Sequence, residues 1–377
     1  MVLIAIIITV FYLILIASFA LGFDKAKEFL LNEVAPKTKF SIVIPFRNEA
    51  KNLAHLLDSI YKLNYPKPLF EVILVDDNSE DESLNIINEK IKDFINSELN
   101  ILVIQNERHT NSPKKDAITT AIKKAKHEWI ITTDADCMLP EFWLNSFDAF
   151  IQKTDTVCVA GPVAYHDENT FLNRFQILDI FSLQGATIGG FGLKRPFLCN
   201  GANFAYTKTA FNSVHGFEGN TEISSGDDIF LLEKIVKIYP ESVHYLKCET
   251  AIVRTASQPS WNALIQQRVR WAAKTSAYNN WFGKITGLVV FLMNFLLILA
   301  PLLAIVGLFN FKIWVYILVI KLNIDFLLLY KTSAFFNQRR AFRSFLTSFC
   351  VYPFFSVYVA FIALFKGYRW KGRVFRK

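Results

Sequence analysis

The chain has 377 residues, a hydrophobic fraction of 52% and a net charge of +8, so it is long enough and apolar enough to form a large core. The charge is uneven, because residues 331–377 carry ten Lys or Arg and no acid, which leaves the rest close to neutral. This pattern gives no support to nucleic-acid binding and fits cytoplasmic flanks of membrane segments. The five cysteines are scattered, which indicates reduced thiols rather than a disulfide framework or a zinc site.

Four long apolar runs predict membrane segments. The first, residues 1–23, is uncharged and long enough to span a bilayer. A cleaved signal peptide is the alternative, but the run lacks a basic start and is too long. The other runs lie near 285–308, 313–330 and 345–365. We therefore expect an anchor at 1–23, an aqueous domain at 24–283 with interfacial helices near 255–283, membrane segments at 284–366 and a basic tail at 367–377.

Strand and helix patterns alternate between these runs. Short apolar stretches predict strands at 39–45, 71–75, 101–104 and 129–133. Leucines at helical spacing follow the first strand, Ser79 and Glu82 form a capping box before the next helix, and another helix is expected over 114–126. This alternation predicts an α/β fold with a mostly parallel sheet and helices on both faces.

The last of these strands ends in two carboxylates, Asp134 and Asp136. Their spacing lets both reach one point at the carboxyl edge of the sheet, where open α/β sheets bind ligands. Two hard oxygen ligands suit Mg²⁺ or Mn²⁺, with water and substrate phosphates as the remaining ligands. A polar turn explains an isolated D-x-D motif equally well, so the neighbouring loops decide between the two interpretations.

Other polar turns are expected at the same edge, at 45–49 and at Asp76-Asp77. Asp76 or Asp77 could accept hydrogen bonds from a base or a ribose hydroxyl. The Lys114/Lys115 pair could offset phosphate charge, although surface lysines are usually only solvated. The Rossmann glycine fingerprint and the P-loop are both absent from the sequence, which argues against a dinucleotide oxidoreductase and a P-loop kinase.

Two later stretches carry small or acidic residues. Gly201 and Ala202 precede a helix expected at Lys208, and they either admit a substrate close to the backbone or form a tight packing turn. Asp227 and Asp228 open another helix, whose dipole favours ionised acids. They are interpreted either as capping residues or as the source of a general base for a hydroxyl nucleophile.

Gln267, Arg270 and Trp271 share one face of a helix expected just before the second apolar run. Arginine can bind a pyrophosphate bidentately, and tryptophan offers a flat face to a sugar. The alternative is an interfacial amphipathic helix with basic and aromatic anchors, and both interpretations can hold together.

In this order, the motifs resemble those of the family-2 glycosyltransferases, which have the GT-A fold. The matching residues are Pro45, Asn48 and Glu49, then Asp76 and Asp77, the D-x-D pair Asp134 and Asp136, Gly201-Ala202-Asn203, Gly226-Asp227-Asp228, and Gln267 with Arg270 and Trp271. The set covers about residues 40–275 and is far more specific than D-x-D alone. The family often has Gly-Glu-Asp where this chain has Gly-Asp-Asp, so the first acid is one methylene shorter.

The resemblance implies a nucleotide-sugar donor, usually UDP-linked, a divalent metal on its diphosphate, and inversion at the anomeric carbon. We assign the general base to Asp228 and keep Asp227 as the alternative. The other expected roles are metal binding by Asp134 and Asp136, acceptor binding by Gly201, Ala202, Asn203 and Trp271, and donor binding by Pro45, Asn48, Glu49, Asp76, Asp77, Lys115, Asp134, Gln267, Arg270 and Trp271.

Because nucleotide sugars are cytosolic, the resemblance places the aqueous domain in the cytoplasm and the chain in the cytoplasmic membrane. Three full spans after that domain would put the basic tail outside, against the positive-inside rule. Pro353 is expected to break the last run, and a re-entrant segment would return the tail to the cytoplasm. Lys321 and Asp325, four residues apart in the third run, are either a functional pair or a buried contact.

Four apolar runs are fewer than a secretion channel usually needs, so we expect sugar transfer to a lipid or lipid-linked glycan acceptor. A processive polysaccharide synthase of the cellulose, chitin or hyaluronan type is the alternative. A non-catalytic scaffold would have no chemical need to keep Asp134, Asp136, Asp228 and Arg270. A nucleotidyltransferase would not explain the Gln267-x-x-Arg-Trp motif beside a membrane.

Overall fold

The computed structural model describes residues 1–93, 98–223, 225–274, 277–365, 368–370 and 373–375, and the chain divides into two compact units. The sheet unit comprises residues 27–166 and 199–256, and the helical unit comprises 1–26, 167–198 and 257–377. The aqueous domain expected at 24–283 thus contributes to both units, and its membrane boundaries stay predictions. Of the basic tail expected at 367–377, residues 367, 371, 372, 376 and 377 lie outside the described residues.

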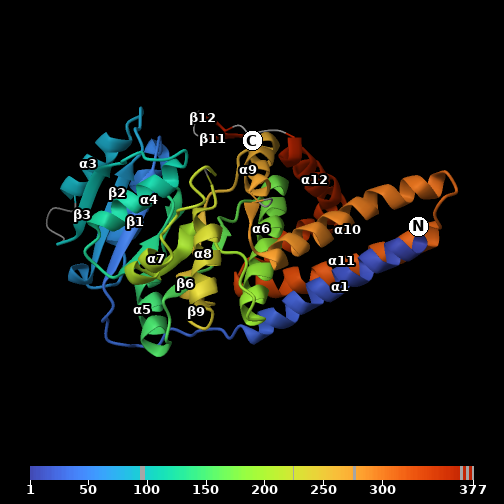
Figure 1. Ribbon diagram of the computed structural model, residues 1–377, viewed down its shortest axis with the longest axis horizontal. Coiled ribbons are helices and arrows are strands. Elements are labelled where there is room, and N and C mark those ends of the chain that lie inside the picture. The colour runs from blue at the N-terminus through green and yellow to red at the C-terminus, as the bar shows by residue number, and fades with distance from the viewer. Residues whose placement is uncertain (94–97, 224, 275–276, 366–367, 371–372, 376–377) are drawn as a thin grey trace. The chain divides into compact units, whose positions relative to one another are not determined.

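Among the described residues, the sheet unit contains a seven-stranded mixed sheet of order β3-β2-β1-β4-β8-β6-β9 (Figure 1). The first four strands are parallel, β8 is antiparallel to both β4 and β6, and β9 is parallel to β6. A smaller sheet has the order β5-β10-β7. The bounds are β1 Phe40–Phe46, β2 Phe70–Asp76, β3 Asn100–Gln105, β4 Trp129–Thr132, β5 Cys137–Met138, β6 Cys158–Ala160, β7 Val163–Tyr165, β8 Phe204–Thr207, β9 Val243–Tyr245 and β10 Val253–Thr255.

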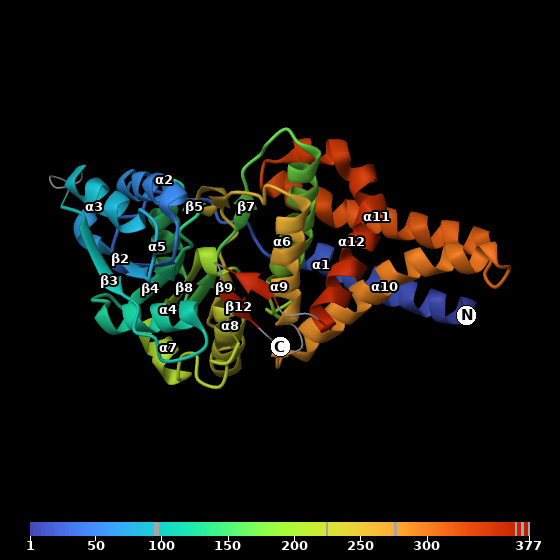
Figure 2. The same cartoon turned by 90° about the horizontal axis from the view of Figure 1, so that it is seen from above.

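The four strands expected from the sequence are confirmed, and both faces of the parallel strands are covered. Ile42 and Ile44 of β1 point into the core formed with Leu53 and Leu57 of α2, while α4 contacts β1 and β2. Figure 2 shows α2 and α4 on opposite sides of the sheet. Burial on both faces explains why these strands are continuously apolar. The helices of this unit are α2 Ala50–Tyr61, α3 Ser83–Asp93, α4 Pro113–Lys124, α5 Trp143–Lys153, α7 Lys208–Ser213 and α8 Asp227–Ile238.

The capping box expected at Ser79 and Glu82 is wrong, because α3 begins only at Ser83. The Ser79 hydroxyl instead accepts a hydrogen bond from the backbone N–H of Asn48, 3.0 Å away. Asp81 takes the place expected for Ser79, since its Oδ1 accepts from the backbone N–H of Ser83 at 3.1 Å. The serine therefore joins the turns after β1 and β2 instead of starting a helix.

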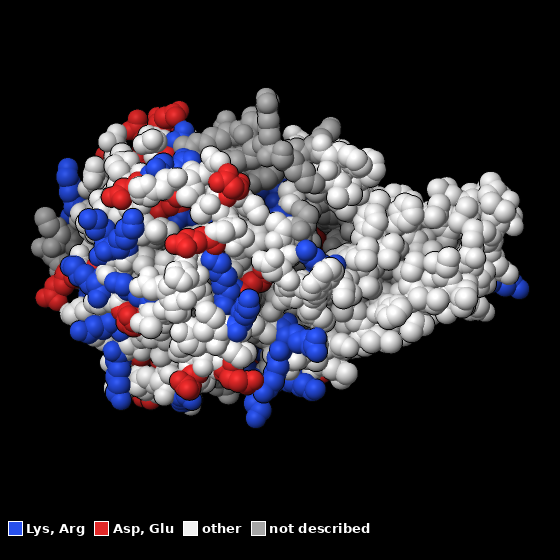
Figure 3. All heavy atoms as spheres, viewed as in Figure 1, with Lys and Arg blue, Asp and Glu red and all other residues white. Residues whose placement is uncertain are grey.

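The helical unit contains four helices that, among the described residues, are long and apolar enough to cross a membrane. They are α1 Val2–Lys25, α10 Trp281–Ile305, α11 Phe311–Phe335 and a span at 339–365 that includes α12 Phe345–Phe365. Figures 1 and 2 show α1, α10 and α11 side by side, and in Figure 3 the surface over them is almost free of charged residues. The remaining elements of this unit are α6 Phe171–Gly192, α9 Trp261–Ala273, β11 Tyr368–Trp370 and β12 Arg373–Phe375. The expected arrangement of one amino-terminal and three carboxy-terminal apolar helices is confirmed.

Two details of the apolar helices resolve questions that the sequence raised. Pro353 does not break its run, because α12 continues through it. Lys321 and Asp325 of α11 form an ion pair at 2.5 Å, and the Tyr12 hydroxyl of α1 donates to the other Asp325 oxygen at 2.6 Å. Lys321 is only 1% exposed, so these charges form a buried contact that joins α1 to α11.

Candidate active site

The candidate site lies at the carboxyl edge of the parallel strands of the sheet unit. β4 ends at Thr132, and the chain continues directly into Asp134. Because β8 runs antiparallel to β4, its first residue, Phe204, pairs with Thr132, which brings the preceding residues 201–203 to the same edge. The Thr132 hydroxyl fixes this junction by donating to the carbonyl oxygen of Gly201 at 2.7 Å.

Lys114, in the first turn of α4, connects two of the acidic segments at this edge. Its ammonium lies 2.7 Å from Asp134 Oδ1 and 3.1 Å from Asp227 Oδ2. Burial alone would lower the pKa of Lys114, but attraction from Asp134 and Asp227, the hydrogen bond to Asp134 and the charge of Asp228 raise this pKa above the ordinary lysine value. The structure thus places a firmly held positive charge among the carboxylates.

Asp228 lies beside Gly201 in the same cluster. The Asp228 Oδ2 accepts from the backbone N–H of Gly201 at 3.2 Å, and Oδ1 accepts from that of Ile229 at 2.8 Å. Both Asp227 and Asp228 are in the first turn of α8, where the helix dipole favours negative charge. Gly201 packs tightly against this cluster, because a Cβ there would lie 3.0 Å from Asp227 Oδ2. The close approach expected at Gly201 is therefore an approach to these carboxylates.

Asp134 and Asp136 fit a divalent metal by the chemistry of their oxygen donors. The Asp134 side chain is 37% exposed and Asp136 is exposed, so solvent or substrate can complete a coordination shell. Burial, followed by repulsion from Asp136 and Asp134, raises the pKa of the adjacent Cys137 well above the ordinary thiol value. A soft sulfur also suits Mg²⁺ or Mn²⁺ less well than the carboxylate oxygens do. Among the described residues, no group of three or more His, Cys, Asp or Glu could hold a metal alone. Substrate phosphates would have to supply further ligands.

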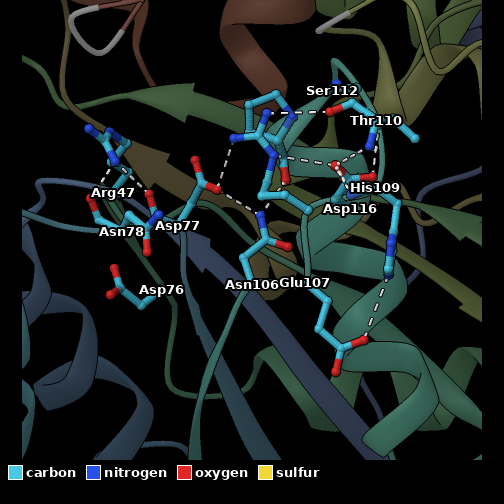
Figure 4. A network of polar contacts seen from close by, with 12 residues as sticks. Arg47, Asp76, Asp77, Asn78, Asn106, Glu107, His109, Thr110, Ser112 and Asp116 are labelled. Carbon is cyan, nitrogen blue, oxygen red and sulfur yellow. Dashed lines mark hydrogen bonds and ion pairs between the residues drawn. The ribbon is translucent and has the colours of Figure 1, made fainter.

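A second polar network surrounds the turn after β2 (Figure 4). Asp77 Oδ1 accepts from Asn106 Nδ2 at 2.8 Å and lies 3.4 Å from an Arg108 guanidinium nitrogen. Asp76 instead holds its own turn, since its carboxylate accepts from the Ser79 N–H at 2.9 Å and from Gln105 Nε2 at 3.1 Å. Figure 4 shows the Asp77 carboxylate directed toward the Asn106 side chain and Asp76 pointing elsewhere.

Arg108 and Asn106 were missed in the sequence analysis, which assigned no role to the segment between the strand expected at 101–104 and the helix expected at 114–126. The Arg108 guanidinium also lies 3.4 Å from Asp116, so two carboxylates hold one partly exposed cation. The only sequence signal was an arginine in the loop after β3, at the edge where the acids were expected. This arrangement places hydrogen-bond donors and acceptors side by side, as recognition of a base and ribose requires.

The loop after β1 is ordered by backbone and side-chain contacts to the turn after β2. The Arg47 guanidinium donates to the carbonyl oxygens of Asp77 and Asn78. Asn48 Oδ1 accepts from the Glu80 N–H at 2.8 Å, and the Glu49 N–H donates to the Ser83 hydroxyl at 2.9 Å. Pro45, Asn48 and Glu49 are all half-buried at this edge. Their roles in donor binding stay predictions.

The surroundings of three residues argue against the ligand contacts expected for them. Lys115 is 1% exposed, and its ammonium donates to the carbonyl oxygens of Asn220 and Ile223 at 2.6 and 2.8 Å. Asn203 is fully buried, and its amide is hydrogen-bonded to Trp143, Pro162 and Ala251. Ala202 is 2% exposed within the core. Lys114 is therefore a better candidate than Lys115 for the phosphate-binding lysine, and in the 201–203 segment it is Gly201 whose backbone N–H bonds Asp228 of the acidic cluster.

Gln267, Arg270 and Trp271 lie on α9 of the helical unit, as a helix was expected there. All three are half-buried. Arg268, between two of them, is buried and pairs with Asp179 of α6 at 2.6 Å. Neither α6 nor this ion pair was expected from the sequence.

Comparison of this chain with models of known protein families identifies the family to which it belongs. Residues 41–215 match the model of glycosyl transferase family 2, and residues 129–365, more than half of the chain, match that of glycosyl transferase family group 2. The chain belongs to glycosyltransferase family 2. The resemblance seen in the sequence is thereby confirmed at the level of the family.

Two relatives of known name match part of this chain, and each match covers at most about half of the relative. The poly(ribitol-phosphate) beta-N-acetylglucosaminyltransferase TarS of Staphylococcus aureus is 36% identical over 115 residues, which are 30% of this chain and 19% of TarS. The beta-monoglucosyldiacylglycerol synthase of Trichormus variabilis is 28% identical over 239 residues, which are 62% of this chain and 48% of that enzyme. This family-2 chain therefore spans about half, or less, of these relatives.

The fold is that of a solved glycosyltransferase. The mannosyltransferase PcManGT from Pyrobaculum calidifontis, determined with GDP-Man and Mn²⁺, superposes with a TM-score of 0.57 at 17% identity, covering 97% of this chain and 99% of that one. The GT-A fold expected for this family-2 chain is confirmed, including its α/β sheet domain and accompanying apolar helices.

Proposed function

We propose that this protein is an inverting, metal-dependent glycosyltransferase that moves a sugar from a nucleotide-sugar donor to a lipid or lipid-linked glycan acceptor at the cytoplasmic membrane face. The observation that carries this proposal is the cluster of Lys114, Asp134, Asp227 and Asp228 around Gly201. It lies in a family-2 chain whose described residues include four apolar helices long enough to cross a membrane. The cluster joins a basic group, the partly exposed Asp134 and a candidate base at one sheet edge.

Two kinds of group would hold the donor: hydrogen-bonding side chains for its nucleoside and positive charges for its diphosphate. Asp77, with Asn106 and Arg108 beside it, offers the hydrogen bonds that a nucleoside needs, and Asp76 keeps that turn in place. A divalent cation, Mg²⁺ or Mn²⁺, held by Asp134 and Asp136 would neutralise charge on the donor diphosphate. Lys114 would supply a second positive charge to it. The family resemblance favours a UDP-linked sugar, and the GDP-Man bound by PcManGT makes a GDP-linked sugar the next donor to test.

Asp228 would act as the general base. Its carboxylate accepts two backbone N–H groups, which orient it without removing its capacity to accept a proton. The acceptor hydroxyl would give its proton to Asp228 while its oxygen bonds to the anomeric carbon, and the bond from that carbon to the diphosphate would break on the opposite face. Asp227 is less suited to this role, because protonating it would remove its ion pair with Lys114.

Gln267, Arg270 and Trp271 would bind the donor diphosphate and the acceptor sugar through amide, guanidinium and aromatic contacts. The proposed acceptor class is supported by the apolar helices and by the names of two relatives, one of which acts on a polymer of ribitol phosphate and the other on a diacylglycerol lipid. The alternative of a processive synthase differs in one observable, since it would release a long polymer.

The test is release of nucleoside diphosphate by the purified full-length protein, across a panel of UDP- and GDP-linked sugars with Mn²⁺ or Mg²⁺ and membrane lipid extract. We expect release from one donor, loss of release with chelator, and a glycolipid of low mass as the product. Asp228→Asn should abolish transfer while leaving donor binding intact. Transfer by Asp228→Asn at near the wild-type rate would show that the base is a different residue, and no release from any donor would contradict the proposed activity.

A further inference from the structure

A buried ion pair lies inside the Gln267-x-x-Arg-Trp motif of α9. The Arg268 Nε donates to Asp179 Oδ2 at 2.6 Å, and both side chains are only 6% exposed. Asp179 belongs to α6, which is in the same helical unit. Removing two charges from water is expensive and is tolerated only where hydrogen bonds satisfy them. Arg268 is therefore held in a fixed place by its ion pair with α6.

The fixed guanidinium contacts two side chains of the motif. One of its terminal nitrogens donates to Gln267 Oε1, and its central carbon lies 4.2 Å from the centre of the Trp271 ring. Arginine at i and tryptophan at i+3 are neighbours on a helix, so the stacking follows from the sequence spacing. A single buried group thus contacts both side chains.

These contacts decide what the motif can offer to a ligand. A guanidinium has only donors, so the Gln267 oxygen faces Arg268, and the group that Gln267 would offer to a ligand is its amide N–H₂. An N–H₂ group suits a phosphate or sugar oxygen. Arg268 also covers one face of the Trp271 ring, so a sugar would stack on the other face.

We propose that Arg268, anchored by Asp179, is a positioning residue that presents the Gln267 amide and the outer face of Trp271 to the phosphate or sugar groups of the substrates. This proposal rests on the proposed function, because it concerns the same transfer reaction. It adds Arg268 and Asp179 to the residues proposed to support transfer, and Asp179 lies on α6, a helix that was not expected from the sequence. Without the anchor, the guanidinium can rotate away, and both motif side chains lose their orientation.

The variants are chosen so that the protein still folds. Asp179→Leu combined with Arg268→Met removes both charges and leaves neither buried alone, a replacement that proteins tolerate. Arg268→Lys keeps a charge near Asp179 but has no planar fork to hold Gln267 and to stack on Trp271. Arg174→Met is the matched control, since Arg174 is an α6 arginine bonded to Ser344 and Asn169, outside the motif. Thermal unfolding in detergent checks folding.

We expect the double variant and Arg268→Lys to lose about 10- to 100-fold in kcat/KM for transfer, because misplacing a binding group by about 1 Å has an effect of that size. Arg174→Met should keep the wild-type value. The decisive comparison repeats the Asp179→Leu/Arg268→Met change in a Gln267→Ala/Trp271→Ala background. If Arg268 acts through these two side chains, the further loss there should be less than about twofold. An equal fold-loss in both backgrounds, or wild-type kcat/KM in the double variant, would overturn the proposal.

A second readout needs no turnover. The contribution of Trp271 to fluorescence emission, obtained by subtracting the spectrum of Trp271→Phe, should shift in Asp179→Leu/Arg268→Met and stay unchanged in Arg174→Met. An unshifted contribution would show that Arg268 does not orient Trp271, whether or not the donor panel finds an active sugar. Absence of turnover in the wild type together with a shifted Trp271 spectrum would contradict the proposed function and support the positioning role.

Discussion

Replacing Gly201 with alanine tests whether the acidic cluster works as one unit. The added methyl would lie 3.0 Å from Asp227 Oδ2, 3.4 Å from Lys114 Nζ and 3.5 Å from Asp228 Cβ. Non-bonded heavy atoms prefer a separation of about 3.5 Å, so the carboxylate or the backbone must move by about half an ångström. Overpacking of this kind costs about 1–3 kcal/mol, and a shift of about 1 Å in a reacting group lowers rates about 100-fold. We therefore expect kcat to fall about 10- to 100-fold.

Nucleoside diphosphate release by the full-length protein measures this loss, with kcat and KM determined separately. Gly219→Ala is the control: its φ of +79° strains an alanine by about 1–2 kcal/mol, but its methyl would meet nothing within 4 Å. It should lower the melting temperature slightly and keep the wild-type kcat. The reasoning fails if Gly201→Ala turns over at the wild-type rate, or if Gly219→Ala loses as much activity.

Three further changes test individual roles. Lys114→Met should raise the donor KM at least tenfold, because a charge-assisted hydrogen bond is worth about 1.5–3 kcal/mol; an unchanged KM would exclude contact with the diphosphate. Lys115→Met should lower the melting temperature and leave the donor KM unchanged, since its ammonium holds the carbonyl oxygens of Asn220 and Ile223, and a raised KM with wild-type stability would return the donor role to Lys115. Asp136→Ala should abolish release, as chelator should in the wild type, and added Mn²⁺ should restore only the wild type; activity of Asp136→Ala with chelator present would argue against a metal.

The strands and the order of the polar turns could be predicted from the sequence because their signals are local. Apolar runs such as residues 72–75 and the acids that follow them are contiguous, and parallel strands bring such turns to one edge. The choice between Lys114 and Lys115 had no such signal. Adjacent residues on a helix point about 100° apart, and only the packing of α4 shows that Lys114 faces Asp134 while Lys115 faces the 220–223 loop.

Residues that act through distant partners were not predictable. Asn203 fits the expected motif, but its amide is committed to Trp143, Pro162 and Ala251, which are 41 to 60 residues away in the chain. Arg268 pairs with Asp179 across 89 residues, on a helix without an amphipathic pattern that would reveal it. A motif identifies which residues belong together, but it does not tell which of them meet the ligand and which hold the others in place.

The direction of β8 is the topological feature on which the acidic cluster depends. Thr132, at the end of β4, pairs with Phe204, at the start of β8, so Gly201 enters the sheet beside Asp134. If β8 were parallel to β4, as a sheet of purely parallel strands would require, its first residue would lie at the other end of a four-residue strand, about 10–13 Å away. Gly201 could then contact neither Asp227 nor Asp228. The mixed sheet therefore brings Gly201, which bonds the candidate base, to the edge where the parallel strands place the candidate metal-binding pair.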